Sequence, residues 1–276
     1  MSIALAPLLM IASGSIHAMV NAIVKGGRDK MAGRALTDGS SALLMLPALA
    51  VVPWPTGAWG YFAGTAVAHA IYLYALIRAY EESDLSAAYP VLRGTAPLVT
   101  ALVTLGILGE HVSTAEIAGI ALIGGSMFAL VLGRHLGRAG LGWSLLTGVA
   151  IAGYTVIDAQ GVRAAPTPFS YIAWVFVIMG AFTVAMFSIV SKGAMFAAAR
   201  TQWRPGVVAG ILSIVTYGMA LYAMSIGPTA PLAALRETGM VTALVIAILF
   251  LKERVTAGRS VAVLGILAGA ALILAG

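Results

Sequence analysis

The chain has no cysteine and little charge, and both shortages limit what kind of protein it can be. Without cysteine there are no disulfides, no thiolate catalysis and no cysteine-ligated metal sites. Charged residues make up 9% of the 276 residues, whereas a soluble domain has about a quarter. Because so few charges cannot coat a soluble surface, the composition excludes an ordinary soluble domain.

Hydrophobic residues make up 61% of the chain, and its mean hydropathy is +0.99. A membrane-spanning helix needs about 20 apolar residues, so we predict an all-α polytopic membrane protein with ten transmembrane helices. The N-terminus carries no basic segment, and we expect it to begin the first span rather than form a cleaved signal. The predicted spans are residues 2–24, 36–52, 57–79, 86–108, 114–133, 141–162, 169–190, 206–226, 229–251 and 257–276.

Two stretches of the chain, residues 86–133 and 229–275, repeat each other. Each is an apolar helix with an arginine near its start, a short acidic turn and a second apolar helix. At a constant offset of 143 the copies align Arg93 with Arg236, Glu110 with Glu253 and Val112 with Val255. A repeat of this length requires one explanation for both copies.

The basic residues alternate between the predicted loops. Of the 16 Lys and Arg residues, 13 lie in the odd-numbered loops or at the span ends beside them, two lie deep within spans, and Arg163 alone lies in an even-numbered loop. Because they form no continuous patch, the net charge of +6 indicates membrane orientation rather than nucleic-acid binding. By the positive-inside rule, the odd loops are cytoplasmic and both termini face outward.

The acidic turn of the first copy lies in an even loop and that of the second copy in an odd loop, so the copies are inverted. We therefore predict two inverted five-helix repeats, residues 1–136 and 137–276, within one transmembrane domain. Inverted repeats recur in secondary transporters, where the substrate site lies near the midplane between the halves.

Arg93 and Arg236 each lie seven residues into a predicted span. That is a depth of about 10 Å in a core about 30 Å thick, where a charge costs about 3 kcal/mol or more. The two guanidinium groups would approach the midplane from opposite sides and could clamp a carboxylate, phosphonate or sulfonate. The alternative is internal pairing of each arginine with Glu237, with Asp158 or with backbone carbonyls freed by prolines.

Two carboxylates lie deep within spans, those of Glu237 and Asp158. Together with His69 they are the candidates for proton coupling, since each can change charge. The alternative for Glu237 is a fixed role as counter-ion of Arg236, His17 or His69. The alternative for the histidines is a neutral ring that is hydrogen-bonded between helices.

Further polar and aromatic residues complete the predicted substrate site. His17 and Asn21 are four residues apart, as are Tyr154 and Asp158, so each pair shares one helix face. The predicted pocket walls are aromatic side chains with polar tips: Tyr72, Tyr74, Trp174 and Tyr217. No metal-binding spacing such as HExxH occurs, and we expect no metal, no cofactor and no catalytic residue.

Prolines and glycines predict how the helices bend and pack. Pro90 and Pro97 lie within span four and Pro231 begins span nine, so both helices should bend or open locally. Gly265 and Gly269 form a small-residue pattern suited to close helix packing. We expect it to join span ten to span five within a monomer; the alternative is a dimer face.

The arginine-bearing segments YPVLRGTAPL (residues 89–98) and LAALRETG (residues 232–239), with their Gly-Glu and Lys-Glu turns and glycine-rich following spans, resemble the drug/metabolite transporter superfamily. Specifically, they resemble its EamA-type ten-span carriers. HAMVNAIVKGGRDK at residues 17–30 also resembles one branch of that family. The resemblance covers essentially the whole chain and implies a central cavity lined by spans one, three, four, six, eight and nine.

This sequence departs from the pattern of the family at two points. Family members generally have cytoplasmic termini, whereas the loop charges here place the termini outside. The membrane-embedded glutamate of the small four-span multidrug relatives has no counterpart in span one, which carries His17 and Asn21 instead. That difference argues against a proton-coupled exporter of cationic drugs.

We predict a multi-pass carrier of the bacterial inner membrane that moves an amino acid, related zwitterion or organic anion by alternating access. Export is the commoner role in the family. Arg93 and Arg236 would hold the anionic end of the substrate, and His17, Asn21, Tyr154 and Asp158 would supply hydrogen bonds or bind an ammonium group. The alternatives are a proton-coupled multidrug or cation exporter, a lipid-handling protein or intramembrane enzyme, and a scaffold subunit.

Overall fold

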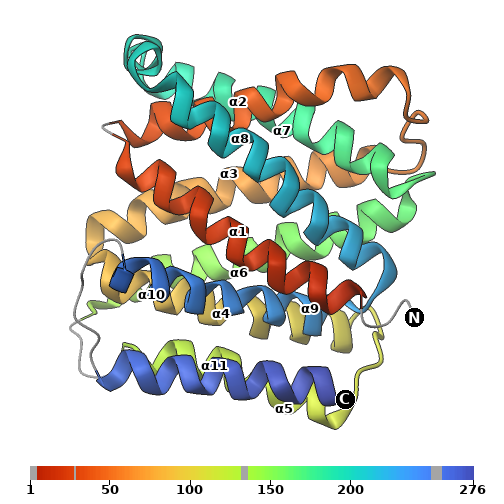
Figure 1. The fold of residues 1–276 in the computed structure, drawn as a ribbon, viewed down its shortest axis with the longest axis vertical. Helices are drawn as coiled ribbons and strands as arrows, with labels where there is room; N and C mark the ends of the chain where they lie inside the picture. Colours follow the sequence, from red (N-terminus) through yellow and green to blue (C-terminus); the bar gives the residue numbers. More distant parts are fainter. Residues whose placement is uncertain (1–4, 28, 132–135, 250–256) are drawn as a thin grey trace.

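The structure is a computed structural model that describes residues 5–27, 29–131, 136–249 and 257–276. Within these ranges there is no strand, and long helices lie side by side in alternating directions (Figure 1). In chain order the helices are α1 (Leu5–Gly26), α2 (Lys30–Met45), η1 (Leu46–Ala50), α3 (Trp59–Glu82), α4 (Leu85–Gly106), α5 (Thr114–Ala129), α6 (Arg138–Ala164), α7 (Pro168–Val190), α8 (Met195–Ile226), α9 (Thr229–Leu235), η2 (Arg236–Thr238), α10 (Gly239–Leu249) and α11 (Ala257–Ala275).

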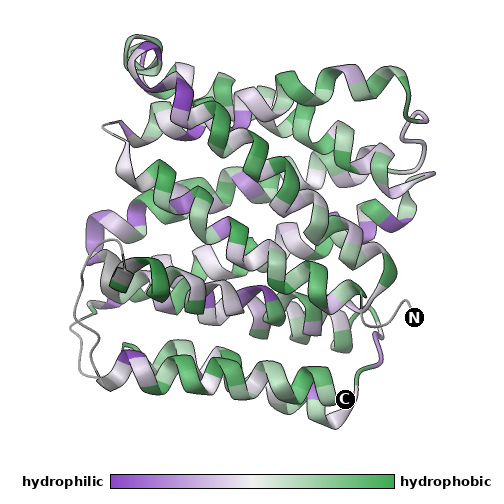
Figure 2. Ribbon diagram, viewed as in Figure 1, coloured by the Kyte–Doolittle hydropathy of each residue, from purple (hydrophilic) through white to green (hydrophobic). Residues whose placement is uncertain are grey.

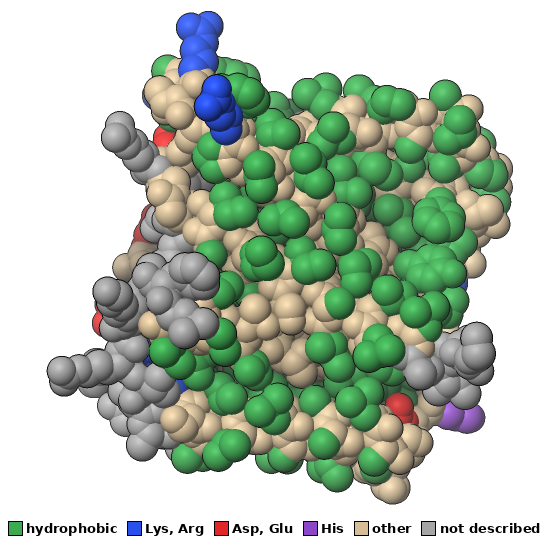
Figure 3. Space-filling model, in the orientation of Figure 1, with side chains coloured by type: hydrophobic (Ala, Val, Ile, Leu, Met, Phe, Trp, Pro, Cys, Tyr) green, Lys and Arg blue, Asp and Glu red, His purple; other side chains and the backbone are tan. Residues whose placement is uncertain are grey.

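Seven of the described helices are long and apolar enough to cross a membrane: α1, α3, α4, α6, α7, α8 and α11. Helix α5 is a shorter apolar helix, and the predicted second and ninth spans are each divided between consecutive helical segments. Hydrophobic residues run along the outer surfaces of the helices (Figure 2), and large side chains such as Leu102 and Val261 are exposed. Apolar side chains cover most of the visible face (Figure 3). The prediction of an all-helical polytopic membrane protein is confirmed, and the count of ten spans stays a prediction.

The helix ends differ from the predicted spans where local signals extend a helix. Helix α2 begins at Lys30 because the side chain of Asp29 accepts a hydrogen bond from the Ala32 N–H at 2.9 Å, which caps the first turn. Helix α8 begins at Met195, well before predicted residue 206, and is kinked at Gln202 (φ −126°, ψ 23°). Both extensions carry polar residues, which a hydropathy window leaves outside a span.

The helices are not opened at the prolines, and the predicted bends stay predictions. Helix α4 continues through Pro90 and Pro97, and Pro231 lies in the first turn of α9, where a proline leaves no helical hydrogen bond unmade. The α-helical hydrogen bonding of the ninth predicted span is interrupted instead at Arg236–Thr238, where the 3₁₀ turn η2 separates α9 from α10; we call this interruption the helix break. Gly14 of α1 lies directly against this break, and a Cβ at Gly14 would overlap the carbonyl oxygen of Arg236.

The main helix contacts join the first part of the chain to the second. Helix α3 packs along α6, and α1 packs along α8; α2 packs on α7, and α5 packs on α11. At the α5–α11 contact, a Cβ on Gly269 would lie 2.7 Å from the carbonyl oxygen of Gly119. The predicted packing of the fifth against the tenth span is therefore confirmed.

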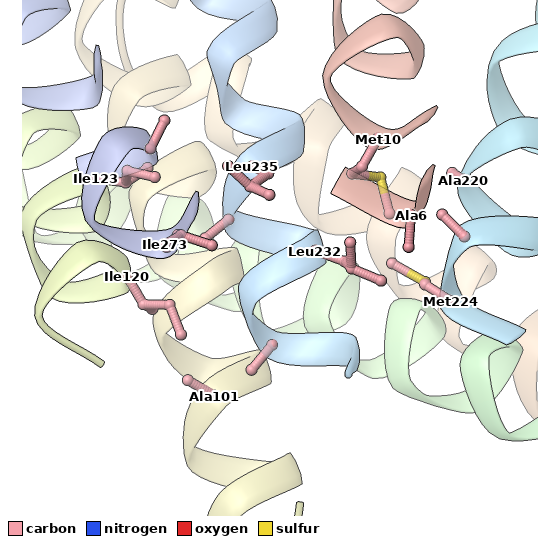
Figure 4. Close-up of a cluster of buried hydrophobic side chains, with 14 of the residues drawn as sticks. Ala6, Met10, Ala101, Ile120, Ile123, Ala220, Met224, Leu232, Leu235 and Ile273 are labelled. Atoms are coloured by element: carbon pink, nitrogen blue, oxygen red, sulfur yellow. The ribbon is translucent and has the colours of Figure 1, made fainter. Parts of the chain in front are cut away.

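Helix α9 lies inside the protein, between α1 and the α5–α11 pair. Its Leu232 and Leu235 are buried in a cluster with Met10 of α1, Ile123 of α5 and Ile273 of α11 (Figure 4). Helix α1 begins and α11 ends on the same side of the molecule, which we call the termini side (Figure 1, right). The loops η1–α3, α4–α5, α6–α7 and α8–α9 lie on this side, because successive helices alternate in direction (Figure 1).

Candidate functional site between the two parts of the chain

A buried ion pair joins α4 to the break that follows α9. The Nε of Arg93 lies 2.9 Å from Oε2 of Glu237, and the two side chains are 13% and 5% exposed. Although the charges are in contact, neither of these two atoms makes a hydrogen bond. Both groups therefore keep hydrogen-bonding capacity that a ligand could use.

The second predicted arginine, Arg236, has a different environment. Its Cζ lies 5.5 Å from the centre of the Tyr217 ring, which is a cation–π contact. Its Nε is buried and makes no hydrogen bond. In the described part of the chain, no carboxylate lies within ion-pair distance of Arg236.

Asp158 of α6 is fully buried and held by two tyrosines. The Tyr171 hydroxyl donates to its Oδ1 at 2.7 Å, and the Tyr217 hydroxyl donates to its Oδ2. Tyr217 therefore contacts Arg236 through its ring and Asp158 through its hydroxyl. The arginine and the carboxylate are linked through one side chain without touching.

Three further predicted residues form an aromatic stack between α3 and α6. The ring of His69 stacks on Tyr154 with centroids 4.2 Å apart, and Tyr72 meets Tyr154 edge-on at 5.9 Å. His69 Nδ1 lies 2.9 Å from the carbonyl oxygen of Thr65. Because a carbonyl oxygen can only accept a hydrogen bond, Nδ1 of His69 carries a proton.

A cavity of about 60 Å³ lies beside the Arg93–Glu237 pair. It brings together three predicted site residues, His17, Asn21 and Arg93. Its other lining residues are Gly14, Ala18, Tyr89, Gly239, Met240 and Ala243. Tyr89, with its ring centre 6.0 Å from the Arg93 guanidinium, was missed from sequence, although its position four residues before Arg93 places it on the same helix face.

Three consecutive residues of α1 hold this helix against the site. The Ser13 hydroxyl donates to the carbonyl of Thr216 at 2.7 Å, and the Thr216 hydroxyl donates to the carbonyl of Ser13 at 2.5 Å. Ser15 and Thr242 are joined at 2.9 Å. With Gly14 against η2, these contacts fix α1 to α8 and α10 where the cavity lies.

Two predicted wall residues pack against other aromatic rings. Tyr74 is 60% exposed and packs edge-on against Trp143 at 5.6 Å, so its ring lies on the outer face of α3. Trp174 packs against Trp54 and Trp59, at 4.9 and 5.4 Å, near the start of α7. The assignment of Tyr74 is corrected, because helical spacing alone does not say which face of an apolar helix points inward; that of Trp174, which is half-buried, stays a prediction.

The predicted partners of the charged groups are also corrected in part. The counter-ion candidates for Glu237 were Arg236, His17 and His69, but its ion-pair partner is Arg93. Internal pairing of Arg93 was one of the two alternatives, and it occurs. The Lys-Glu turn at residues 252–253 lies outside the described residues.

The helical fold and its buried charges are those of a polytopic membrane transporter, and comparison with known proteins defines the class. The sequence profile described as "EamA-like transporter family" matches residues 138–275, which is half of the chain. The chain therefore belongs to the EamA-like transporter family, within the drug/metabolite transporter superfamily. Members of this family are transporters, not enzymes.

The solved structures similar to this chain include a crystal structure with a TM-score of 0.74 at 19% sequence identity. The similarity covers 97% of this chain and 94% of the other, and at this identity it shows the fold alone. A search of the curated proteins found no match to the sequence.

Proposed function

We propose that this transporter carries a small amino acid, or a related zwitterion or anion, by alternating access around Arg93, Arg236 and Glu237. The observation that carries the proposal is the buried Arg93–Glu237 pair, which joins the two parts of the chain beside a cavity. A second arginine, without a carboxylate partner among the described residues, lies next to Glu237 in sequence. Buried charges in membrane proteins mark substrate or ion pathways.

The helix pairing supports two inverted halves of five spans each. If the two halves are repeats, span three (α3) corresponds to span eight (α8), and span one (α1) corresponds to span six (α6). The α3–α6 contact then corresponds to the α8–α1 contact, and both contacts are extensive. The α2–α7 and α5–α11 contacts map onto themselves under the same correspondence. This pattern is expected if residues 1–136 and 137–276 are inverted repeats. In this proposal α2–η1, α5 and α9–α10 are the three spans that complete the ten, beside the seven long apolar helices.

The balance of charge favours a substrate with a carboxylate. Glu237 neutralises Arg93, whereas Arg236 faces the ring of Tyr217. An uncompensated cation in a low-dielectric interior is costly, so an anionic group placed there is stabilised. A guanidinium binds a carboxylate through two parallel hydrogen bonds, and the free Nε of Arg236 is available for one of them.

Glu237 fits the amino end of a zwitterion. Asp158 was the carboxylate that the sequence suggested for this role, but both its oxygens already accept hydrogen bonds from tyrosine hydroxyls. The Glu237 carboxylate touches Arg93 without a hydrogen bond to it from Nε. A substrate carboxylate on the arginines would free Glu237 to accept from the substrate ammonium group.

The size of the cavity implies movement during transport. A volume of about 60 Å³ is small beside the roughly 300–1,000 Å³ of ligand pockets. A whole amino acid would therefore enter only when α1 separates from α10. We accordingly treat this conformation as a closed or nearly closed state of an alternating-access cycle.

Asp158 is the strongest of the three proton-coupling candidates. It is fully buried and, within the described residues, has no cation at ion-pair distance. Glu237 is already paired with Arg93, and His69 Nδ1 donates to Thr65.

We further propose a bacterial inner-membrane location, cytoplasmic odd loops and export as the direction.

The role of the arginines is tested by transport in liposomes. We expect labelled amino acids to enter and Arg236→Ala to lower apparent affinity about 10- to 100-fold, because a charge-assisted hydrogen bond contributes about 1.5–3 kcal/mol. Arg236→Lys keeps the positive charge but loses the planar guanidinium group, so its apparent affinity should lie between those of the unchanged protein and Arg236→Ala. Arg200→Ala, which removes an exposed arginine at the start of α8, is the matched control. Movement of choline-like cations alone, unaffected by Arg236→Ala, would support the multidrug alternative instead.

The role of Glu237 is tested by substrate preference. Glu237→Gln should weaken transport of amino acids and strengthen transport of carboxylates of the same size that lack the amine, because Arg93 loses its internal counter-ion. Competition between such a pair of substrates measures the change. Glu82→Gln, in an exposed ion pair with Arg78, is the control. An equal loss for both substrates would assign Glu237 to structure.

The role of Asp158 is tested by separating proton-driven uptake from exchange. Asp158→Asn keeps the shape of the side chain but removes its charge and its exchangeable carboxyl proton. We expect exchange of substrate without a pH gradient to persist and the stimulation by a proton gradient to disappear. Asp84→Asn, at the exposed N-cap of α4, is the control. Undiminished stimulation in Asp158→Asn would move coupling to Glu237 or His69.

A further inference from the structure

Arg163 is the one Lys or Arg residue that the sequence analysis placed in an even-numbered loop. Its side chain points into the protein and is hydrogen-bonded there. It lies in the last turn of α6. Its Nε donates to the carbonyl of Met224 at 2.9 Å, and its Nη2 donates to the carbonyl of Gly227 at 2.8 Å and to the Thr229 hydroxyl oxygen at 3.0 Å. This arginine therefore binds the α8–α9 junction instead of lying in solvent as a topological signal.

Glu110, from the acidic turn of the first repeat copy, completes the same cluster. Its Oε1 accepts from Arg163 Nη1 at 3.0 Å and from the Thr229 hydroxyl at 2.7 Å. Its Oε2 accepts from the backbone N–H groups of Thr229 at 2.9 Å and Ala230 at 3.4 Å. All four acceptor positions of the carboxylate are used. Gly109 (φ +67°) gives the backbone the left-handed turn that precedes Glu110.

This cluster joins the two parts of the chain on the termini side. Among the five ion pairs of the described residues, three join residues of the same helix: Arg34–Asp38 in α2, and the two pairs of Arg78 in α3. The other two, Arg93–Glu237 and Arg163–Glu110, each link residues 1–136 to residues 137–276. Helix α9 connects them, because Thr229 begins it and Glu237 follows its end.

We propose that Glu110, Arg163 and Thr229 form a gate that closes the termini side in this conformation and must open for the substrate to pass there. The proposal rests on the alternating access proposed above. The Glu110 and Arg163 side chains are 12% and 29% exposed, so water can replace their mutual contacts once the halves separate. Release of Thr229 frees the start of α9, and through it the position of Glu237 at the cavity.

The absence of cysteine makes the gate testable by thiol labelling. Ala243→Cys places a single thiol in the cavity lining, and Thr56→Cys, at an exposed site in the η1–α3 loop, identifies the termini side. A membrane-impermeant thiol reagent is added to vesicles of each orientation. Glu110→Gln in the Ala243→Cys background should raise labelling from the termini side about fivefold or more, because the open state gains population.

Two further variants make the result decisive. Thr229→Val keeps the shape but removes the hydroxyl shared by Glu110 and Arg163, and it should raise labelling by a smaller factor. Glu82→Gln removes a carboxylate from an exposed pair within α3 and should leave labelling unchanged. Unchanged labelling in folded Glu110→Gln and Thr229→Val, an equal rise in Glu82→Gln, or loss of folding in both gate variants would overturn the gate.

The labelling requires no substrate, so the gate and the proposed substrate site can fail separately. An effect of Glu110→Gln on labelling with no effect of Arg236→Ala on transport would keep the gate and reject the binding role of the arginine. The reverse result would keep the substrate site and reject the gate.

Discussion

The contact between Arg93 and Glu237 is the interaction on which the rest of the arrangement depends. A charge deep in a bilayer costs about 3 kcal/mol or more, so neither group is tolerated without a partner or a polar cavity. The partners come from opposite parts of the chain, and they meet where the ninth predicted span breaks into α9 and α10. The approach of α1 through Gly14 and the small cavity beside Arg93 lie at the same place. Charge, helix break and cavity therefore form one site.

Helix α9 lies between the proposed gate and the proposed substrate site. Its start is held by Glu110 and Arg163, and the turn that follows its end carries the residues that face Arg93 and Tyr217. The leucines of α9 pack in the core. Tyr217 of α8 links this arrangement to Asp158 of α6, since one side chain contacts both the second arginine and the buried carboxylate. The proposed gate and substrate site thus share α9, and the proposed proton site is connected to them through Tyr217.

The sequence predicts the class of the fold and most of the polar residues of the site, and it lists Glu237 among the possible partners of Arg93 without choosing between them. Low charge and long apolar runs determine a helical membrane protein, and a charge inside an apolar span identifies Arg93, Arg236, Asp158 and Glu237. The partner of Arg93 depends on how the two halves dock, which helical periodicity does not contain. Tyr74 was misplaced because lipid and protein interior are both apolar, so hydropathy does not distinguish an outward face from an inward one. Local opening of span nine was predicted from Pro231, whereas the 3₁₀ turn lies at Arg236–Thr238, against Gly14 of α1, a contact that the sequence alone does not contain.

Substrate binding in the cavity beside Arg93 is tested by the protection of a single cysteine from a thiol reagent. Ala18→Cys places a thiol in the cavity lining, and Thr56→Cys places one at an exposed site in the η1–α3 loop. A transported amino acid should slow thiol labelling of Ala18→Cys, with half of the effect at its KM, and leave Thr56→Cys unchanged. Labelling of Ala18→Cys that is indifferent to every transported substrate, or equal protection at both positions, would contradict the account.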